Sequence, residues 1–286
     1  MKDVLFDTLL DTVKLIPFLV LTYILMEFLE HKTSEKTETA IRKAGRFGPV
    51  IGGLLGIVPQ CGFSASAASL YTGRVISAGT LIAVFLSTSD EMLPVFLSEK
   101  VNPSVIIEVL AIKAVTAVIL GLAVDIAVRM IKKGPREVEI HSLCEDGNCH
   151  CEEDGIIKSA LRHSARITLF IFIIGFVINT VIYFVGEEAI SRIFTGVPVI
   201  GCLLSALVGL IPNCAASVII TELFISGVIS AGAMISGLLT GCGIGLLVLF
   251  RTNKKHPLEN LFITVMMYVF GVAVGAVVEA LGVAIQ

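Results

Sequence analysis

The chain has 286 residues, of which 55% are hydrophobic, with a mean hydropathy of +0.92 and a net charge of −3. Polar side chains are too few to cover a water-facing surface, which excludes a single soluble domain. The small net charge and the lack of a long Lys/Arg block argue against nucleic-acid binding. The sequence motifs of P-loop ATPases, H-E-x-x-H metalloproteases and G-x-S-x-G hydrolases are absent, so we expect no enzyme.

The first half of the chain, residues 1–131, is predicted to form one transmembrane repeat that begins with a helix over residues 4–30. From Leu15 to Phe28 this segment is nearly uncharged. At about 1.5 Å per residue, the helix is long enough to cross a hydrocarbon core of about 30 Å. The polar and mostly basic residues 31–46 then predict a solvated loop or surface helix.

The next apolar stretch, from Pro49 to Gly73, is interrupted in its middle by Pro-Gln-Cys-Gly at residues 59–62. Proline removes a backbone donor and clashes with the preceding turn, and glycine loosens the helix further. Because neither piece can cross a bilayer alone, we expect a re-entrant hairpin with its tip inside the membrane. Two crossing helices are predicted to follow, over residues 77–98 and 104–131.

The long polar segment of residues 132–157 is predicted to be a cytoplasmic linker between two halves. Among its acidic residues are five side chains that could bind zinc or another thiophilic cation: His141, Cys144, Cys149, His150 and Cys151. The spacing C-x4-C-x-C matches no standard zinc finger, so a solvated acidic loop without metal is the open alternative.

Residues 158–286 are predicted to form a second repeat that copies the first. At an offset of 153 residues, a helix-breaking Pro-x-Cys-x-x-Ser and a following Val-Ile-Ser-Ala-Gly both recur, which duplication explains better than chance. Each copy crosses the membrane three times, since a re-entrant hairpin returns to the side it entered from. Three is an odd number, so the two copies must lie in opposite orientations. The predicted fold is an all-α polytopic membrane protein of two inverted repeats. The second copy would hold a helix at 158–185, a hairpin at 197–226, and helices at 230–250 and 257–285.

Positive charges gather in the loops on one side of this topology. The positive-inside rule therefore predicts that the linker and the loop of residues 31–46 face the cytoplasm, with both termini outside the cell membrane. The predicted partners are the lipid bilayer and the cargo, and a homodimer is left open.

The two hairpin tips are predicted to meet near the membrane midplane, where inverted-repeat transporters bind their cargo. Cys61 and Cys214 place a thiol at each tip, and thiols are soft ligands for thiophilic metals or trivalent arsenic. The alternative is that both cysteines only fill small apolar spaces. Polar side chains at the tips are suited to satisfy the backbone groups that a helix break frees, or to hold a cargo: Gln60, Ser64, Asn213 and Ser217.

Acidic residues inside apolar helices are costly and are therefore functional candidates. Asp90, Glu91 and Glu222 fall at similar predicted depths, which suggests a shared site for a cation or a proton. For Asp90 and Glu91, a wetted structural place near the outer rim is the open alternative. Glu108 and Lys113, five residues apart on one helix, are predicted to form a buried charge pair that braces the bundle.

Four motifs together resemble the ten-segment heavy-metal exporter family, whose members are described variously as arsenic efflux proteins and manganese transporters. They are P-Q-C-G-F-S at 59–64, T-S-D-E-x-L-P at 88–94, P-N-C-A-x-S-V at 212–218 and G-x-G-L-L-V-L-F-R-x-N at 243–253. The resemblance extends over nearly the whole chain and implies ten membrane segments, five in each half. The linker departs from the family pattern because it holds only two histidines.

These features predict a gradient-driven secondary transporter that exports a metal or metalloid, such as manganese, another heavy metal or arsenic. No permanently bound cofactor is expected, and protons are the expected coupling ion. The alternative is a permease for a small organic anion or thiol compound, because helix ends can bind a carboxylate equally well.

Overall fold

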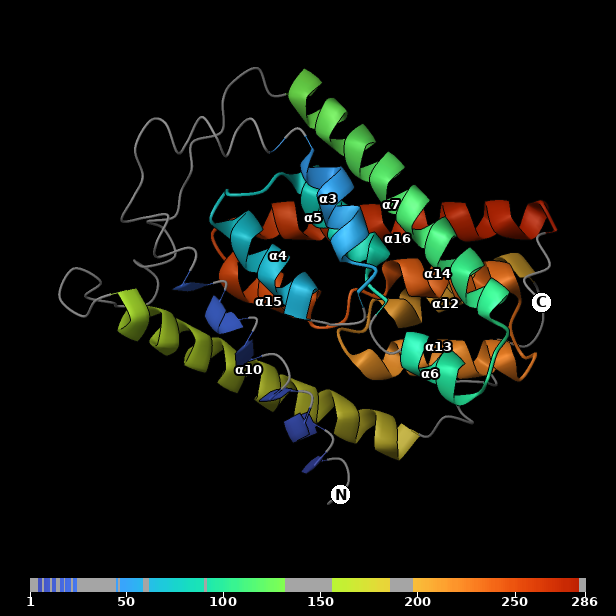
Figure 1. Ribbon diagram of the computed structural model, residues 1–286, viewed down its shortest axis with the longest axis horizontal. Coiled ribbons are helices and arrows are strands. Elements are labelled where there is room, and N and C mark those ends of the chain that lie inside the picture. The colour runs from blue at the N-terminus through green and yellow to red at the C-terminus, as the bar shows by residue number, and fades with distance from the viewer. Residues whose placement is uncertain are drawn as a thin grey trace.

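A computed structural model of the chain describes residues 45, 47–58, 62–89, 92–131, 156–185 and 198–282, together with separate positions between residues 5 and 24. The linker residues 132–155 and nearly all of the loop 31–46 lie outside these ranges. Every regular element in the described part of the chain is a helix (Figure 1).

The first half of the chain contributes five of these helices, and each has a counterpart of similar length in the second half. In the first half they are α3 (Gly48–Leu55), α4 (Gly62–Thr72), α5 (Ala78–Ser87), α6 (Met92–Ser98) and α7 (Pro103–Ile131). After α10 (Ile156–Val185), the second half contains α12 (Pro198–Gly209), α13 (Cys214–Ile225), α14 (Ala231–Thr240), α15 (Gly245–Thr252) and α16 (Pro257–Ala280).

Four stretches of described residues are long and apolar enough to cross a bilayer: Ala78–Ser98, Pro103–Met130, Ala231–Thr252 and Pro257–Ala280. The predicted class of an all-helical polytopic membrane protein is therefore confirmed. The four stretches lie at four of the six predicted crossings, those of residues 77–98, 104–131, 230–250 and 257–285.

Two of the four spans are discontinuous, although the sequence predicted an uninterrupted helix at 77–98 and at 230–250. The first span is divided into α5 and α6, which are separated by residues 88–91. The second is divided into α14 and α15, separated by residues 241–244. The prediction of continuous helices is wrong because hydropathy, which detects a span, is insensitive to a short break inside it.

Each break has a local cause in the sequence. At the first, the hydroxyls of Thr88 and Ser89 donate to backbone carbonyls of the preceding turn, at 2.7 and 3.0 Å, and Thr88 leaves the helix with φ −52° and ψ 126°. Such local bonds compete with helical continuation. At the second break, Gly241, Gly243 and Gly245 lie within five residues, and Gly243 adopts a φ of +52°, which glycine tolerates at little cost.

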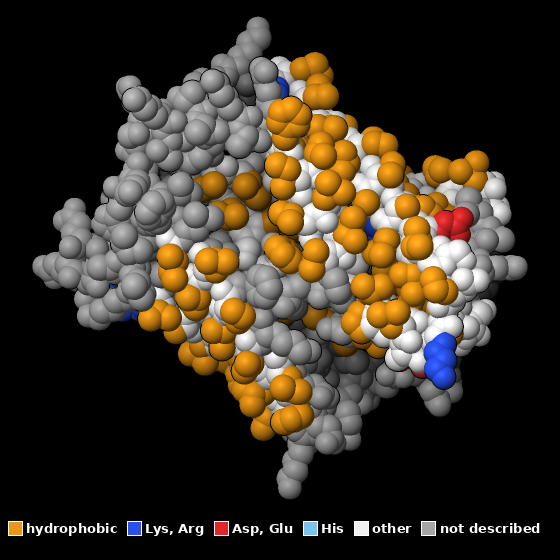
Figure 2. All heavy atoms as spheres, in the orientation of Figure 1, with side chains coloured by type: hydrophobic (Ala, Val, Ile, Leu, Met, Phe, Trp, Pro, Cys, Tyr) orange, Lys and Arg blue, Asp and Glu red, His pale blue; other side chains and the backbone are white. Residues whose placement is uncertain are grey.

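The two discontinuous spans lie at the centre of the molecule and the two uninterrupted ones lie outside them. The most apolar windows of Ala78–Ser98 and Ala231–Thr252 are 75% and 89% buried, against 33% and 28% for the spans in α7 and α16. The exposed positions of the outer helices are apolar, and Figure 2 shows hydrophobic side chains over much of the face that α7 crosses. Such a surface suits contact with lipid.

The two central spans begin in the same way. Ser77 caps α5 by accepting a hydrogen bond from the N–H of Thr80 at 3.1 Å, and Ser230 caps α14 by accepting one from the N–H of Ala233 at 3.2 Å. Serine is among the best residues at this position because its side-chain oxygen satisfies an otherwise unpaired amide.

A carboxylate from an outer helix binds the start of each central span. Asp125 on α7 accepts from the N–H of Gly79 at 2.9 Å, and Glu279 on α16 accepts from the N–H of Gly232 at 3.2 Å. Asp125 also accepts from the Ser77 hydroxyl at 2.7 Å. Negative charge at a helix N-terminus is stabilised by the unpaired amides and by the helix dipole.

We expect Asp125→Ala to destabilise the protein by about 1–3 kcal/mol, because it leaves a buried amide and a hydroxyl without their charged acceptor. Glu279→Ala should cost less, since its hydrogen bond is longer and its side chain is half-buried. Thermal unfolding in detergent measures both. Glu108→Ala, at an exposed position of α7, is the control, and equal melting temperatures for Asp125→Ala and this control would contradict the expectation.

Candidate functional site

The sequence placed the candidate site at two helix breaks, one after α3 and one after α12. The second is fully described: α12 ends at Gly209 and α13 begins at Cys214. Asn213 is extended, with φ −151° and ψ 145°, and its side-chain oxygen accepts from the N–H of Ala215 at 3.2 Å. The amide that the break frees is therefore satisfied by a side chain of the tip, as expected. At the first break, Pro59, Gln60 and Cys61 lie outside the described residues.

The helix that follows each break packs against a half-helix from the other half of the chain. The first such pair is α4 with α15, and the second is α13 with α6 (Figure 1). The preceding helices stay within their own half, because α3 packs on α5 and α7, and α12 packs on α14 and α16. We refer to the α4–α15 and α13–α6 contacts as the two seams.

Ser64 and Ser217, two of the predicted site residues, both lie against the break of the second central span. Ser64 on α4 is fully buried, and a Cβ added to Gly245 would lie 2.7 Å from its Cβ. Ser217 on α13 is also buried, and a Cβ added to Gly241 would lie 3.2 Å from its hydroxyl oxygen. The helices that follow the two tips thus reach the same four-residue break, residues 241–244, from its two ends.

Two buried thiols belong to this region. Cys214, predicted from the sequence, is the first residue of α13, and Cys242, which was not among the predicted site residues, lies in the break itself. Both are buried, and neither forms a disulfide bond. The signal for Cys242 is its position between two glycines inside an apolar span. Among the described residues, no three His, Cys, Asp or Glu side chains are grouped closely enough to hold a metal ion.

The predicted acidic residues are placed only in part. Asp90 and Glu91 lie outside the described residues, although Thr88 and Ser89, which precede them, are buried. Glu222 is described, and its side chain is exposed on a different face of α13 from Cys214 and Ser217. The structure therefore does not bring the Glu222 carboxyl into the buried region with them. The linker candidates His141, Cys144, Cys149, His150 and Cys151 also fall outside the described residues.

Lys113 is the buried cation of this region, and the predicted pair with Glu108 is not found. The Glu108 side chain is exposed, whereas that of Lys113 is 1% exposed. The physical reason is that residues five apart on an α-helix point about 140° away from each other. The Nζ of Lys113 donates instead to the carbonyls of Thr88, at 2.5 Å, and Leu238, at 2.6 Å.

The side-chain contacts differ between the two seams, being polar at the α4–α15 seam and aromatic at the α13–α6 seam. Beside α4 and α15, the hydroxyls of Thr72 and Thr252 form a hydrogen bond of 2.8 Å. Just beyond it, Arg74 donates to Glu259 at 2.9 Å, in a half-buried ion pair that joins the end of α4 to the start of α16. Between α13 and α6, by contrast, Phe96 and Phe224 meet edge to face with their ring centroids 6.5 Å apart.

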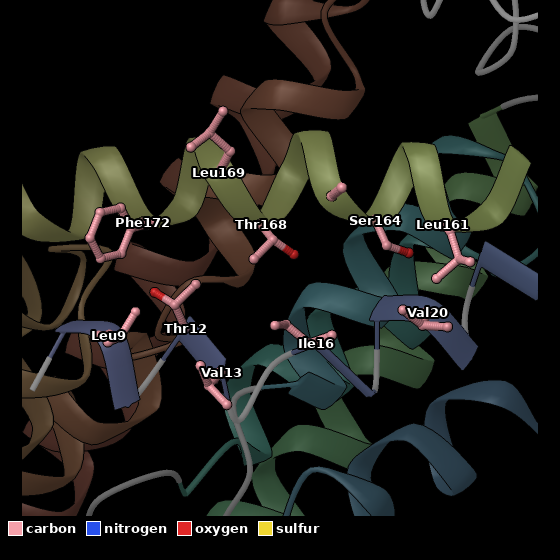
Figure 3. Close-up of a pocket in the computed structure, with 11 residues that line it drawn as sticks. Leu9, Thr12, Val13, Ile16, Val20, Leu161, Ser164, Thr168, Leu169 and Phe172 are labelled. Atoms are coloured by element: carbon pink, nitrogen blue, oxygen red, sulfur yellow. The ribbon is translucent and has the colours of Figure 1, made fainter. Parts of the chain in front are cut away.

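A groove of about 400 Å³ lies outside the seams, between α10 and the described helical residues of segment 5–24 (Figure 3). Its lining is almost entirely apolar, and Ser164 and Thr168 of α10 point toward the helix that carries Thr12 and Ile16. The hydroxyls of Ser164 and Thr168 are buried, with no hydrogen-bond partner among the described residues. This groove holds none of the predicted site residues.

Residues 1–195 match the model of a protein family described as "Putative, 10TM heavy-metal exporter". No curated protein and no solved structure matches the chain. The matched range includes the first central span, Lys113, the linker and α10.

Proposed function

Because the chain belongs to the family of ten-segment heavy-metal exporters and its two seams meet at one buried helix break, we propose that it is a secondary transporter that exports a metal or metalloid. The observation that carries the proposal is the approach of Ser64 and Ser217 to the two ends of residues 241–244. Breaks of this kind free backbone carbonyls and amides for a cargo inside a bilayer, where other polar partners are scarce.

The proposed architecture is two inverted repeats, residues 1–131 and 158–286, each with three crossings and a re-entrant hairpin. It is supported by equivalent contacts at the sequence offset: a serine cap on each central span, a carboxylate on each capped helix, and a seam to the opposite half. Inversion would set the two seams at opposite faces of the membrane, so that each could open to one side while the other stays closed.

The proposed movement is alternating access around the central break. Opening the α4–α15 seam would separate Thr72 from Thr252 and Arg74 from Glu259, whereas opening the α13–α6 seam would separate two phenylalanine rings. On the topology expected from the positive-inside rule, the first opening faces the cytoplasm. The uninterrupted outer helices α7 and α16 would serve as the scaffold.

The proposed cargo is a thiophilic metal or trivalent arsenic, held by tip residues of both halves. Cys61 and Cys214 would supply soft ligands, and Gln60, Ser64, Asn213 and Ser217 would supply oxygen donors or acceptors. Manganese prefers oxygen ligands, so it would rely on carboxylates and carbonyls more than on the thiols. A permease for a small organic anion or thiol compound remains the second candidate, supported by the helix N-terminus of α13 at the tip.

A cargo panel in membrane vesicles tests the proposal, with manganese, zinc, iron, arsenite and an organoarsenical compared under an imposed proton gradient. For a thiophilic cargo, Cys214→Ser should weaken apparent affinity by about tenfold or more, the loss of roughly 1.4 kcal/mol of binding free energy. Cys202→Ser is the matched control, because Cys202 is a buried free thiol on α12, outside both seams. Movement of none of the panel cargoes, with a small organic anion or thiol compound transported instead, would favour the second candidate.

Proton coupling is proposed to run through Asp90, Glu91 or Glu222. A carboxyl that binds either a proton or a cation, but not both, links the two fluxes. We expect at least one of Asp90→Asn, Glu91→Gln and Glu222→Gln to change the pH dependence of transport in vesicles while expression and insertion stay normal. An unchanged pH profile in all three variants would contradict coupling through these residues.

The membrane placement follows from the same topology. We propose a multi-pass protein of the cell membrane with the linker in the cytoplasm and both termini outside. Reduced cytoplasmic thiols would let Cys144, Cys149 and Cys151, with His141 and His150, bind metal before or during export.

A further inference from the structure

Lys113 places a positive charge at the centre of the molecule, where the two discontinuous spans pass each other. Its side chain is 1% exposed, and it lies near the middle of the apolar span Pro103–Met130. Its ammonium donates to the carbonyl of Thr88, which belongs to the C-cap of α5. It also donates to the carbonyl of Leu238, in the last turn of α14. A single ammonium group therefore binds the C-terminal ends of two half-helices.

These two carbonyls are available because their helices end. The last four carbonyls of an α-helix have no partner within the helix, and the aligned peptide dipoles give that end a partial negative charge of about half an electron. In α14, the amide of Cys242, which would bond to Leu238 in a continuous helix, donates to the carbonyl of Thr240 at 3.0 Å. The break thus leaves the Leu238 carbonyl to Lys113.

The acids of the first central span, Asp90 and Glu91, lie in its break just past Thr88 and outside the described residues. Neither Ala78–Ser87 nor Ala231–Thr240 contains an ionisable side chain. Asp125 and Glu279, the described acids that contact these helices, bind the opposite ends at Gly79 and Gly232. Two helix C-termini that converge inside a membrane form the carbonyl environment in which broken-helix transporters bind a sodium ion.

We propose that the Lys113 ammonium is a tethered substitute for a coupling sodium ion at the crossing of α5 and α14. This inference rests on the proposed transport function and adds that transport does not require sodium as a coupling ion. With the cation covalently attached, the two half-helix ends are held together without sodium, and transport is independent of sodium. Removing the ammonium exposes the carbonyls of Thr88 and Leu238 to a free cation.

The test compares thermal unfolding of the full-length protein in detergent with NaCl, KCl or choline chloride at equal ionic strength. We expect the wild type to melt at the same temperature in all three salts. Lys113→Ala should melt lower in KCl and choline chloride, and sodium should raise its melting temperature by several degrees, because an ion that binds only the folded state stabilises it. A residue that merely braces the bundle would give the same loss without any response specific to sodium.

Lys113→Arg and Lys113→Met are the matched variants. Arginine keeps the charge and should remain insensitive to sodium, whereas methionine fills the volume without charge and should be destabilised in all three salts. If Lys113→Ala is not recovered folded, Lys113→Gln takes its place. Lack of a sodium response in the alanine or glutamine variant, or a sodium dependence of the wild type, would overturn the inference.

Two outcomes separate this inference from the proposed function. The unfolding measurement needs no cargo, so a sodium response of Lys113→Ala supports the tethered cation even if the vesicle panel shows no metal transport. Conversely, metal transport by the wild type that requires sodium would leave the proposed function intact and reject the role of Lys113.

Discussion

Gly245→Ala is expected to reduce transport to below about one tenth of the wild-type rate, because the alanine side chain has no space in the closed α4–α15 seam. The added Cβ would lie 2.7 Å from the Cβ of Ser64, 2.8 Å from the ring of Phe85 and 3.0 Å from the backbone carbon of Ser64. Backbone atoms cannot move aside as the end of a flexible side chain can. Overpacking of a close contact typically costs about 1–3 kcal/mol, enough to shift a balanced conformational equilibrium by tenfold or more.

The measurement is uptake into vesicles together with the melting temperature of the purified protein. Gly201→Ala is the control, because its Cβ would meet the Cβ of Ala233 at 3.4 Å, an ordinary van der Waals contact. Combining Gly245→Ala with Ser64→Gly removes the closest atom and should recover part of the lost stability. Wild-type transport and stability in Gly245→Ala would show that the seam does not close as the structure has it.

Neutralising the Arg74–Glu259 ion pair is expected to open the α4–α15 seam about tenfold more often. The pair is half-buried and its N–O distance is 2.9 Å, so this charge-assisted hydrogen bond should contribute roughly 1.5–3 kcal/mol to the closed arrangement. The reporter is the Thr72→Cys variant, whose new thiol lies in the seam opposite Thr252. In this background, Arg74→Gln and Glu259→Gln should each raise the rate at which a thiol reagent labels position 72.

The double variant Arg74→Gln/Glu259→Gln decides whether the two side chains act as a pair. If they do, its labelling rate should be close to that of either single variant, because the second change removes nothing further. Glu99→Gln, an exposed carboxylate beyond α6, is the control for a general effect of charge. Additive effects of the two single changes would mean that Arg74 and Glu259 act through separate contacts.

The sequence predicted the breaks that contain proline but not the breaks inside the central spans. Pro212 removes a backbone donor, so a break before Cys214 follows from covalent structure alone. Residues 241–244 are Gly-Cys-Gly-Ile, which remain apolar enough for the hydropathy of the span to stay high. The glycines there were a usable signal, since three within five residues weaken a helix by more than any single one.

A single sequence could not predict which helices pack together in the two seams. That α4 packs on α15 and α13 on α6 depends on contacts between residues far apart in the chain, and neither hydropathy nor local propensity carries this information. Ser64 and Ser217 could be proposed as site residues because they recur after the breaks. The predicted partner of Lys113 is wrong because spacing along one helix carries no information about the helix ends beside it.

The exchange of seam partners between the halves has a consequence for biosynthesis. Thr72 and Thr252 are 180 residues apart in the chain, so at a translation rate of about 5–20 residues per second α4 waits roughly 10–35 s for α15. During that interval α4 and α6 are already synthesised without the helices that cover them. The first half of the chain must therefore persist in the bilayer as an unfinished intermediate, held by the contacts of α3, α5 and α7, until the second half completes it.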